Sequence, residues 1–300
     1  QLKSLVLSGV PAAFRGGVWY EMSGAAAKAL EFHSDFYIKL VARGGSAQSA
    51  YDISKDVDRT YPGHEFFEGV WDPATQLTLT RVLGAFAARN PDIGYCQSTN
   101  FLAGFLILLC EEDQAFWIMD AIVNELLPPN YYSASLVGVH ADQRVLAALL
   151  KQWIPDVSAV LEHVGIDVAV ITLEWFMALF TTSLPTHVAM RVWDAFLLLG
   201  NEVLFRVALA LFWLRREDIM AAAGDMPALF ALLQGLPTSQ HDADELMQYA
   251  FPNKSKLKVA LKLKWSGLSN QVLTPLRRKA RAEIIADLEE HMVKKTGRAM

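Results

Sequence analysis

The sequence predicts an all-α protein built from many helices. Of its 300 residues, 53% are hydrophobic and 20% are charged, which indicates helices that are buried on more than one face. Apolar side chains recur at helical spacing through most of the chain, and strand-like alternation is nearly absent before residue 253. A chain of this length forms either one large domain or two lobes that share a helical core.

The N-terminal elements follow from helical spacing and from glycine punctuation. Residues 1–14 are expected to form a short lead-in, and a helical pattern runs from about 12 to 41. Within that pattern, Arg15 and Trp19 are spaced i, i+4 and therefore share one face. The glycine- and serine-rich residues 44–49 predict a flexible loop.

Two helices are expected in the next part of the chain. Tyr61-Pro62-Gly63 predicts a turn, and a helix follows from about 74 to 88. Its helical apolar stripe is formed by Leu77, Val82, Leu83 and Phe86. Asn90-Pro91-Asp92 ends this helix, and Gly94 allows the backbone to bend. The second helix is expected at about 97–110.

Helical patterns continue to the C-terminus, with breaks at proline and glycine. The predicted segments are 113–126, 141–153, 156–163, 168–181, 186–199, 202–221, 227–234 and 242–250. Asp242 or Asp244 is expected to cap the last of these. Residues 257–265 alternate as a strand does, but a lone strand has no partner here, so we expect this segment to be helical or extended against the core. A final amphipathic helix is expected at 275–293.

Several classes of protein are disfavoured by composition. The longest apolar run, Phe101–Cys110, is too short to span a bilayer. The first residue is Gln1 and no signal-peptide pattern follows it, so we expect the chain to be part of a longer protein. The two cysteines, Cys96 and Cys110, fit a reducing compartment and not a disulfide scaffold. The seven histidines show no metal-ligand spacing, so we expect no metal site.

Charge is distributed unevenly along the chain. Residues 254–300 contain 12 Lys and Arg against 4 Asp and Glu, whereas residues 1–253 contain 15 against 28. A basic tail on an acidic body is a candidate for contact with anionic lipid or an acidic partner. A solvated, charged terminal helix is the simpler interpretation.

Two short polar segments carry the residue types that GTP hydrolysis needs. Arg59 follows Asp56 and Asp58, and Gln97 precedes the most apolar run of the protein. An arginine can neutralise charge on a transferring phosphoryl group, and a glutamine can orient the attacking water. The chain has no phosphate-binding loop of its own, so any nucleotide would belong to a partner.

Five short motifs occur in a fixed order along the chain. They are Gly9-Val10-Pro11 with Arg15 and Trp19; Ile53, Asp56 and Arg59; Tyr95-Cys96-Gln97; Trp175-Phe176 with Phe180; and Ser183-Leu184-Pro185 followed by Arg191-Val192-Trp193-Asp194. The second has the pattern I-x-x-D-x-x-R and the third Y-x-Q. Together they resemble the TBC domain, the helical module of Rab GTPase-activating proteins.

This resemblance implies a domain organisation. It predicts a V-shaped, two-lobed, all-α TBC-type domain at residues 5–252. The N-terminal lobe, about 5–130, would carry both finger residues, and the C-terminal lobe would cover about 131–252. Residues 253–300 would form a basic helical extension.

The resemblance also implies a mechanism in which the chain activates a GTPase and turns over no substrate itself. Arg59 would enter the nucleotide pocket of a GTP-bound Rab protein as an arginine finger, and Gln97 would position water as a glutamine finger. Asp56, Tyr95 and Asn100 would support them. GTP and magnesium would be held by the GTPase, so no cofactor of the chain's own is expected.

The later motif residues are expected to be structural. An arginine on an apolar helix needs a carboxylate partner, which Asp194 or Glu174 would supply. The residues assigned to this group are Arg15, Trp19, Arg191, Trp193 and Asp194.

Other interpretations remain open at this point. Taken alone, Arg59 is better explained as a surface arginine paired with Asp56 or Asp58, and Gln97 as a residue that binds backbone at a helix start. A non-catalytic scaffold that binds Rab or other proteins is the alternative: Ser98-Thr99, in place of the Gly-Met common in the family, is a weak argument for it, and the intact Arg59 and Gln97 argue against it. Under either hypothesis we expect a role in vesicle trafficking, no nucleic-acid partner, and a cytoplasmic location, peripheral on endomembranes.

Overall fold

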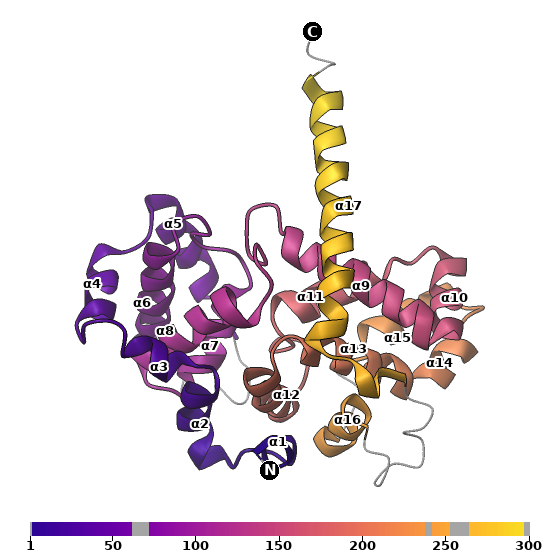
Figure 1. The fold of residues 1–300 in the computed structure, drawn as a ribbon, viewed down its shortest axis with the longest axis horizontal. Helices are drawn as coiled ribbons and strands as arrows, with labels where there is room; N and C mark the ends of the chain where they lie inside the picture. Colours follow the sequence, from indigo (N-terminus) through magenta and orange to yellow (C-terminus); the bar gives the residue numbers. More distant parts are fainter. Residues whose placement is uncertain (1, 62–71, 238–241, 253–263, 297–300) are drawn as a thin grey trace.

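The computed structural model describes residues 2–61, 72–237, 242–252 and 264–296. All regular structure in these ranges is helical, and none of their residues lies in a β-strand. The predicted all-α class is therefore confirmed. Figure 1 shows two groups of helices, α2 to α8 on one side and α9 to α17 on the other, which is the predicted two-lobed arrangement.

The first lobe is organised around one central helix. Its helices are α2 (Arg15–Met22), α3 (Ala25–Ala29), α4 (Phe36–Arg43), α5 (Ala47–Val57), α6 (Pro73–Arg89), α7 (Thr99–Ile107) and α8 (Glu112–Ala121). Helix α6 contacts α4, α5, α7 and α8. Asp72 caps its start by accepting a hydrogen bond from the Thr75 amide. Because α6 touches four neighbours, it fixes the relative positions of the segments that follow α5 and precede α7.

The second lobe has two central helices. Its helices are α9 (Val137–Trp153), α10 (Pro155–Val164), α11 (Val168–Met177), α12 (Thr186–Leu199), α13 (Glu202–Leu214), α14 (Arg216–Ala221), α15 (Met226–Gln234), α16 (Ala243–Ala250) and α17 (Asn270–Thr296). Helix α9 contacts α10, α11 and α17. Helix α13 is buried from Glu202 to Phe212, which explains its nearly continuous apolar sequence.

The N-terminal segment differs from its prediction in three ways. The lead-in contains a helix, α1 (Leu2–Leu7), and a 3-10 turn. The helical stretch predicted at 12–41 is broken twice: at Gly24, whose left-handed φ of 79° separates α2 from α3, and at residues 30–35, which separate α3 from α4. The loop predicted at 44–49 is wrong in its second half, because the Ser46 hydroxyl accepts a hydrogen bond from the Ser49 amide and starts α5.

Later boundaries are closer to the predictions. The stretch predicted as one helix at 202–221 divides at Arg215 into α13 and α14. The segment predicted at 113–126 ends in a π-helical turn, η3 (Ile122–Leu126). Asp242 caps α16, as expected. Leu77, placed in the buried stripe of α6, is 56% exposed.

Helix α17 packs along α9 and then extends away from the body of the molecule (Figure 1). It begins at Asn270, earlier than predicted, and contains Pro275 near its start. The alternating segment at 257–265 lies mostly outside the described residues, as do Pro62 and Gly63 of the predicted turn. Among the described helices, none combines the length and the hydropathy that a membrane crossing requires.

One buried carboxylate joins the two lobes. Asp194 of α12 is fully buried and accepts hydrogen bonds from Arg15 Nε at 3.0 Å, Trp19 Nε1 at 2.8 Å and the Val10 amide at 3.0 Å. The indole rings of Trp19 and Trp193 lie 5.5 Å apart. Asp194 is thus the carboxylate partner of Arg15. The sequence predicts two candidates for this role, Asp194 and Glu174.

Arg191 has a different partner from Arg15. Its Nη1 donates to Asp244 of α16 at 2.7 Å, and its Nη2 donates to the carbonyl oxygen of Leu7 in α1 at 3.0 Å. A Cβ at Gly9 would lie 2.8 Å from the Arg191 Nε atom, so glycine is required for this close approach. The interaction holds α1 and α16 against α12.

Candidate functional site

Arg59 lies two residues beyond the end of α5, on the surface. Its Nε donates a hydrogen bond to Asp56 Oδ1 at 2.8 Å. The two residues differ sharply in exposure, because the side chain of Arg59 is 58% exposed and that of Asp56 only 6%. Asp56 therefore pairs with the guanidinium itself, through Nε and Nη2, while the rest of the Arg59 side chain remains open to solvent.

The segment with Gln97 is attached to the same carboxylate. Gly94 bends the chain with a φ of 60°, and Tyr95 follows it. The Tyr95 hydroxyl donates to Asp56 Oδ2, the oxygen that Arg59 does not use in its Nε bond. Two segments 39 residues apart in the chain are thus joined through one side chain.

A second set of hydrogen bonds joins the same two segments in the interior. The buried Asn100 side chain donates from Nδ2 to the Thr60 hydroxyl at 2.8 Å, and its Oδ1 accepts from the Ser98 amide at 3.1 Å. The Thr60 hydroxyl in turn donates to the Asp56 carbonyl oxygen at 2.6 Å. Each polar atom named here is satisfied, which makes the connection rigid.

Close packing supports the hydrogen bonds. A Cβ at Gly104 of α7 would lie 3.1 Å from Thr60 Cγ2 and 3.1 Å from Tyr61 Cε2. A side chain here would press on both neighbours, so glycine favours this close approach of α7 to the Arg59 segment. The Tyr61 hydroxyl also donates to the Phe101 carbonyl oxygen at 2.9 Å, so a third contact joins the two segments.

Gln97 itself is exposed. None of the hydrogen bonds among the described residues involves its side-chain amide. Of the five predicted site residues, Arg59 and Gln97 face solvent, whereas Asp56 and Asn100 are buried and Tyr95 is partly buried. The guanidinium of Arg59 and the amide of Gln97 are therefore accessible to another molecule. The three residues that support their segments are mostly covered.

A family model described as the Rab-GTPase-TBC domain matches residues 12–220. The chain belongs to this family. The match begins in the first lobe and continues into the second, so it includes Asp56, Arg59, Tyr95, Gln97 and Asn100.

Relatives and solved structures agree with this assignment. The chain is similar to small G protein signaling modulator 3 of Homo sapiens, with 35% identity over 96% of the chain and 37% of the relative. It is similar to growth hormone-regulated TBC protein 1 of Homo sapiens, with 36% identity over 74% of the chain and 66% of the relative. The crystal structure of the Chlamydomonas flagellar RabGAP TBC domain superposes with a TM-score of 0.75 at 28% identity, covering 84% of this chain and 83% of that one. The chain thus spans only about a third of the length of the signaling modulator.

Ser98 marks a local difference within this TBC domain. Its φ of 85° and ψ of −24° place it in the left-handed region, where a side chain is strained and glycine is not. This backbone explains why glycine is common in the family at this position. The serine keeps the turn, because helix α7 follows it directly at Thr99, two residues later than the predicted start at 97.

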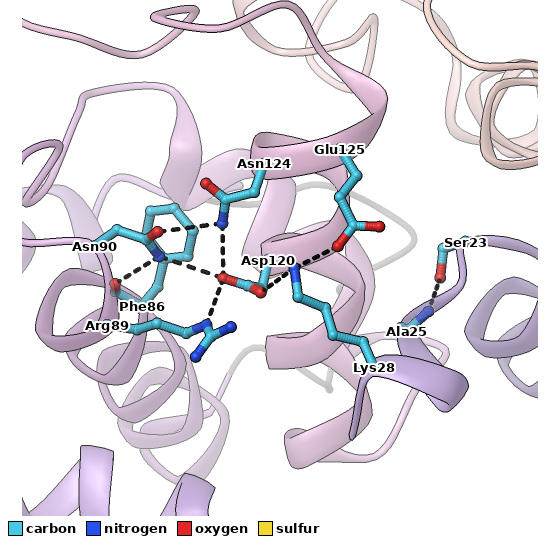
Figure 2. Close-up of polar contacts among 9 residues, drawn as sticks. All are labelled: Ser23, Ala25, Lys28, Phe86, Arg89, Asn90, Asp120, Asn124 and Glu125. Carbon is cyan, nitrogen blue, oxygen red and sulfur yellow. Dashed lines mark hydrogen bonds and ion pairs between the residues drawn. The ribbon is translucent and has the colours of Figure 1, made fainter. Parts of the chain in front are cut away.

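The start of the loop that leads to Gln97 is anchored by a buried acid. Figure 2 shows Arg89, Asn90 and Asn124 converging on Asp120, with Lys28 between Asp120 and Glu125. The distances to Asp120 Oδ1 are 2.9 Å from Arg89 Nε and 2.8 Å from Asn124 Nδ2, and Lys28 Nζ lies 2.7 Å from Oδ2.

Asn90 connects Asp120 to the loop that follows α6. Its side-chain amide lies 3.4 Å from Asp120 Oδ1, and its backbone carbonyl accepts hydrogen bonds from the Ile93 amide at 3.0 Å and the Gly94 amide at 2.8 Å. The bend before Tyr95 is therefore connected to the core of the lobe.

Two titratable groups beside Gln97 are held neutral. Burial, followed by the hydrogen bond to Asp56, raises the pKa of Tyr95 well above its usual range. Burial raises the pKa of the Cys96 thiol to about 11, so the thiolate needed for nucleophilic chemistry is scarce at neutral pH. In the part of the chain that the structure describes, no three His, Cys, Asp or Glu side chains are grouped as metal ligands.

Sequence reasoning missed three contributors to this site: Thr60, Gly104 and Asp120. Thr60 and Gly104 act through contacts between segments 40 or more residues apart, which no local pattern reveals. The role of Asp120 could have been predicted from the sequence. It is the one acid within the apolar sequence Phe116–Val123, and a buried acid needs a cationic partner.

Proposed function

We propose that this TBC domain activates Rab GTPases by inserting Arg59 and Gln97 into the nucleotide site of the GTP-bound partner. Family membership supports a Rab-directed role in GTPase activation. The observation that carries the finer proposal is the link through Asp56: one buried carboxylate holds both Arg59 and Tyr95, and both finger side chains are exposed.

The resting contact of Arg59 does not oppose this role. The guanidinium is more than half exposed, but Asp56 is buried, so separating them costs more than the about 0.2–1 kcal/mol of a fully exposed pair. Contact of Arg59 with a phosphoryl group would offset this cost. An arginine presents a planar fork of donors that suits the oxygens of a phosphoryl group. When Arg59 leaves, Tyr95 still donates to Asp56, so the segment keeps one of its two supports.

The remaining chemistry would come from the GTPase. GTP and its magnesium ion would be bound by the partner, and Gln97 would orient the attacking water. The chain would supply no cofactor and release no product of its own. Consistent with this division of labour, both finger side chains are exposed and the segments that carry them are joined through Asp56.

Arg59→Ala is the decisive variant. An arginine finger supplied in trans accelerates hydrolysis by about 10³–10⁵-fold, so we expect stimulated phosphate release to fall by about this factor. Arg59→Lys should recover little, because lysine lacks the fork of donors. The measurement is single-turnover phosphate release across a panel of GTP-loaded Rab proteins, with circular dichroism to verify the fold. Wild-type stimulation of every responsive Rab by the Arg59→Ala protein would show that the assignment is wrong.

Gln97→Ala tests the second finger separately. Because the side-chain amide of Gln97 makes no hydrogen bond to other described residues, its loss should leave stability unchanged. Stimulated hydrolysis should fall by about 10²-fold or more, since removal of a group that acts in the transition state costs about this much. Gln152→Ala, a matched exposed glutamine in α9, serves as the control and should retain activity. Full stimulation by Gln97→Ala would assign the water to the glutamine of the GTPase.

A non-catalytic Rab-binding scaffold is the second candidate. The strained Ser98, where the family commonly has glycine, favours it, because the left-handed residue directly follows Gln97. A scaffold would bind GTP-loaded Rabs without accelerating hydrolysis in any member of the panel. Under both proposals the setting is vesicle trafficking on the cytoplasmic face of endomembranes, with the basic C-terminal segment as a candidate for peripheral contact.

A further inference from the structure

A cavity of about 400 Å³ lies between α17 and the segment that links η3 to α9. It is far in the chain from the finger segments, and its walls come from the second lobe and the end of the first. Helix α17 contributes three arginines to the lining, and residues 126–129 contribute apolar side chains. The lining of the cavity includes Leu126, Pro129, Asn201, Arg277, Arg278 and Arg281.

Two of the three arginines in this cavity lack an acidic partner among the described residues. Arg277 is neutralised, because it forms an ion pair with the fully buried Asp142, with 3.2 Å between Nη2 and Oδ2. Arg281 donates only to the neutral carbonyl oxygen of Pro129, at 3.3 Å. Arg278 makes no hydrogen bond or ion pair to any residue that the structure describes. The cavity therefore faces two positive charges that nothing described here compensates.

The one acid that lines the cavity is already engaged. Glu125 Oε1 lies 2.5 Å from Lys28 Nζ, so its negative charge is balanced by a lysine of α3 (Figure 2). Summed over the lining residues and the two partners, Lys28 and Asp142, the site has an excess of positive charge. An anionic ligand would meet two guanidinium groups without displacing an existing carboxylate.

A buried amide provides a second, independent observation. Asn201 lines the cavity and is only 4% exposed. None of the hydrogen bonds between described residues involves its side chain, although buried amides are satisfied in most proteins. A ligand oxygen in the cavity would accept from this amide. Asn201 is mostly covered, yet its amide is not among the polar atoms sealed from solvent, so a ligand in the cavity can reach it.

We propose that this cavity binds a phosphate monoester. Guanidinium forks match phosphate oxygens in pairs, and Arg278 and Arg281 approach from the same helix. The apolar wall at Leu126 and Pro129 suits the carbon skeleton that carries the phosphate. The same chemistry is present in soluble phosphorylated compounds and in lipid headgroups such as that of phosphatidic acid. Binding would hold the basic helix α17 against the segment after η3.

The test uses the 300-residue chain and three probes: inorganic phosphate, glycerol 3-phosphate, and phosphatidylcholine vesicles with or without phosphatidic acid. Calorimetry and vesicle flotation are performed at about 0.15 M salt, where long-range surface attraction is largely screened. Saturable binding of glycerol 3-phosphate that does not extend to vesicles identifies a soluble ligand. Binding to phosphatidic acid vesicles that glycerol 3-phosphate displaces identifies a lipid headgroup. Either result supports the site.

Matched charge variants locate the binding. Arg278→Gln and Arg281→Gln should each weaken affinity by about tenfold, since each removes one charge-assisted contact. Asn201→Ala should weaken it by about fivefold, as expected for a neutral hydrogen bond. Lys279→Gln removes the same charge from the same helix outside the cavity and should change affinity by less than about twofold.

Three results would overturn the proposal. One is the absence of saturable binding to every probe. Another is an equal loss in Lys279→Gln, which would indicate general surface attraction. The third is vesicle binding that glycerol 3-phosphate does not displace. None of these results bears on Arg59 or Gln97, so the outcome is independent of the proposed activation of Rab proteins.

Discussion

Ser98 shows how one residue can carry local strain at a site. Its left-handed backbone is required by the turn between Gln97 and α7, because the chain must reverse direction before the helix starts. A residue with a side chain in this region costs about 1–2 kcal/mol relative to an unstrained backbone. The strain is tolerated because the Ser98 amide donates to Asn100 and the Asn100 side chain is itself bound to Thr60.

Ser98→Gly is expected to stabilise the protein by up to about 1 kcal/mol. Glycine removes the steric cost, and its greater freedom in the unfolded chain offsets part of the gain. Ser54→Gly, the same change at an exposed position inside α5, should instead destabilise by about 0.5–1 kcal/mol. The free energy of unfolding in urea measures both. Equal destabilisation by the two variants would contradict the strain assigned to Ser98.

At the scale of elements, polar contacts fix how the helices of the first lobe meet. Glu112 at the start of α8 accepts a hydrogen bond from Arg81 of α6 at 2.8 Å and another from Tyr37 of α4 at 2.7 Å. Three helices therefore meet at one carboxylate. The hydrogen bond from Arg81 is the main reason that the pKa of Glu112 lies below its ordinary value of 4.5.

This contact predicts a dependence of stability on pH. Because the folded-state pKa of Glu112 is lowered, its contribution to stability is present above pH 4.5 and is lost as the pH falls through the folded-state value. Glu112→Gln should therefore reduce stability near pH 7 and lose less stability than the wild type on acidification below pH 4.5. Urea midpoints at several pH values provide the measurement, with the exposed Glu21→Gln as the control. Parallel wild-type and Glu112→Gln profiles would contradict the prediction.

The sequence was most informative at the level of single elements. The apolar spacing in α6 and the run of apolar residues in α7 predicted both helices closely, because each pattern depends on neighbours within one turn. The short cap at Ser46 was missed, and a helix start was read as a loop, because glycine and serine appear in both. The pairing of Arg59 with Asp56 was available from their i, i+3 spacing.

The connections between segments were not available from local patterns. Nothing near Tyr95 indicates that its hydroxyl reaches Asp56, and nothing near Gly104 indicates that Tyr61 will pack against it. These contacts depend on how α5, α6 and α7 pack, which a single sequence does not specify. The roles of Arg59 and Gln97 came from the motif resemblance and stay predictions.

At the scale of the whole molecule, the joint at Asp194 links the two lobes. A fully buried carboxylate binds Arg15 and Trp19 of α2, while its own helix, α12, belongs to the second lobe. The buried aromatic rings of Trp19, Phe105 and Trp193 pack against one another beside it, with 5.0 Å between the last two. The joint thus combines a buried ion pair with an apolar shell that excludes water.

Asp194→Asn should be strongly destabilising. The amide keeps the shape of the side chain but leaves the buried charge of Arg15 uncompensated, and such losses amount to about 3–5 kcal/mol. Asp287→Asn removes an exposed partner of Arg144 and should change stability little. Urea denaturation followed by tryptophan fluorescence measures both, since Trp19 and Trp193 report on the joint. A midpoint for Asp194→Asn close to that of the wild type would show that the joint is not essential to the fold.

The sharing of Asp56 between Arg59 and Tyr95 has a consequence for how such a site can diversify. Arg59 and Tyr95 both bind the carboxylate of Asp56, so a mutation that shifts one of them also changes the position of the other. Compensating changes would therefore have to appear in both segments together. Efforts to retune such a domain for another partner would do better to leave this shared anchor untouched and vary the exposed ring of residues around it.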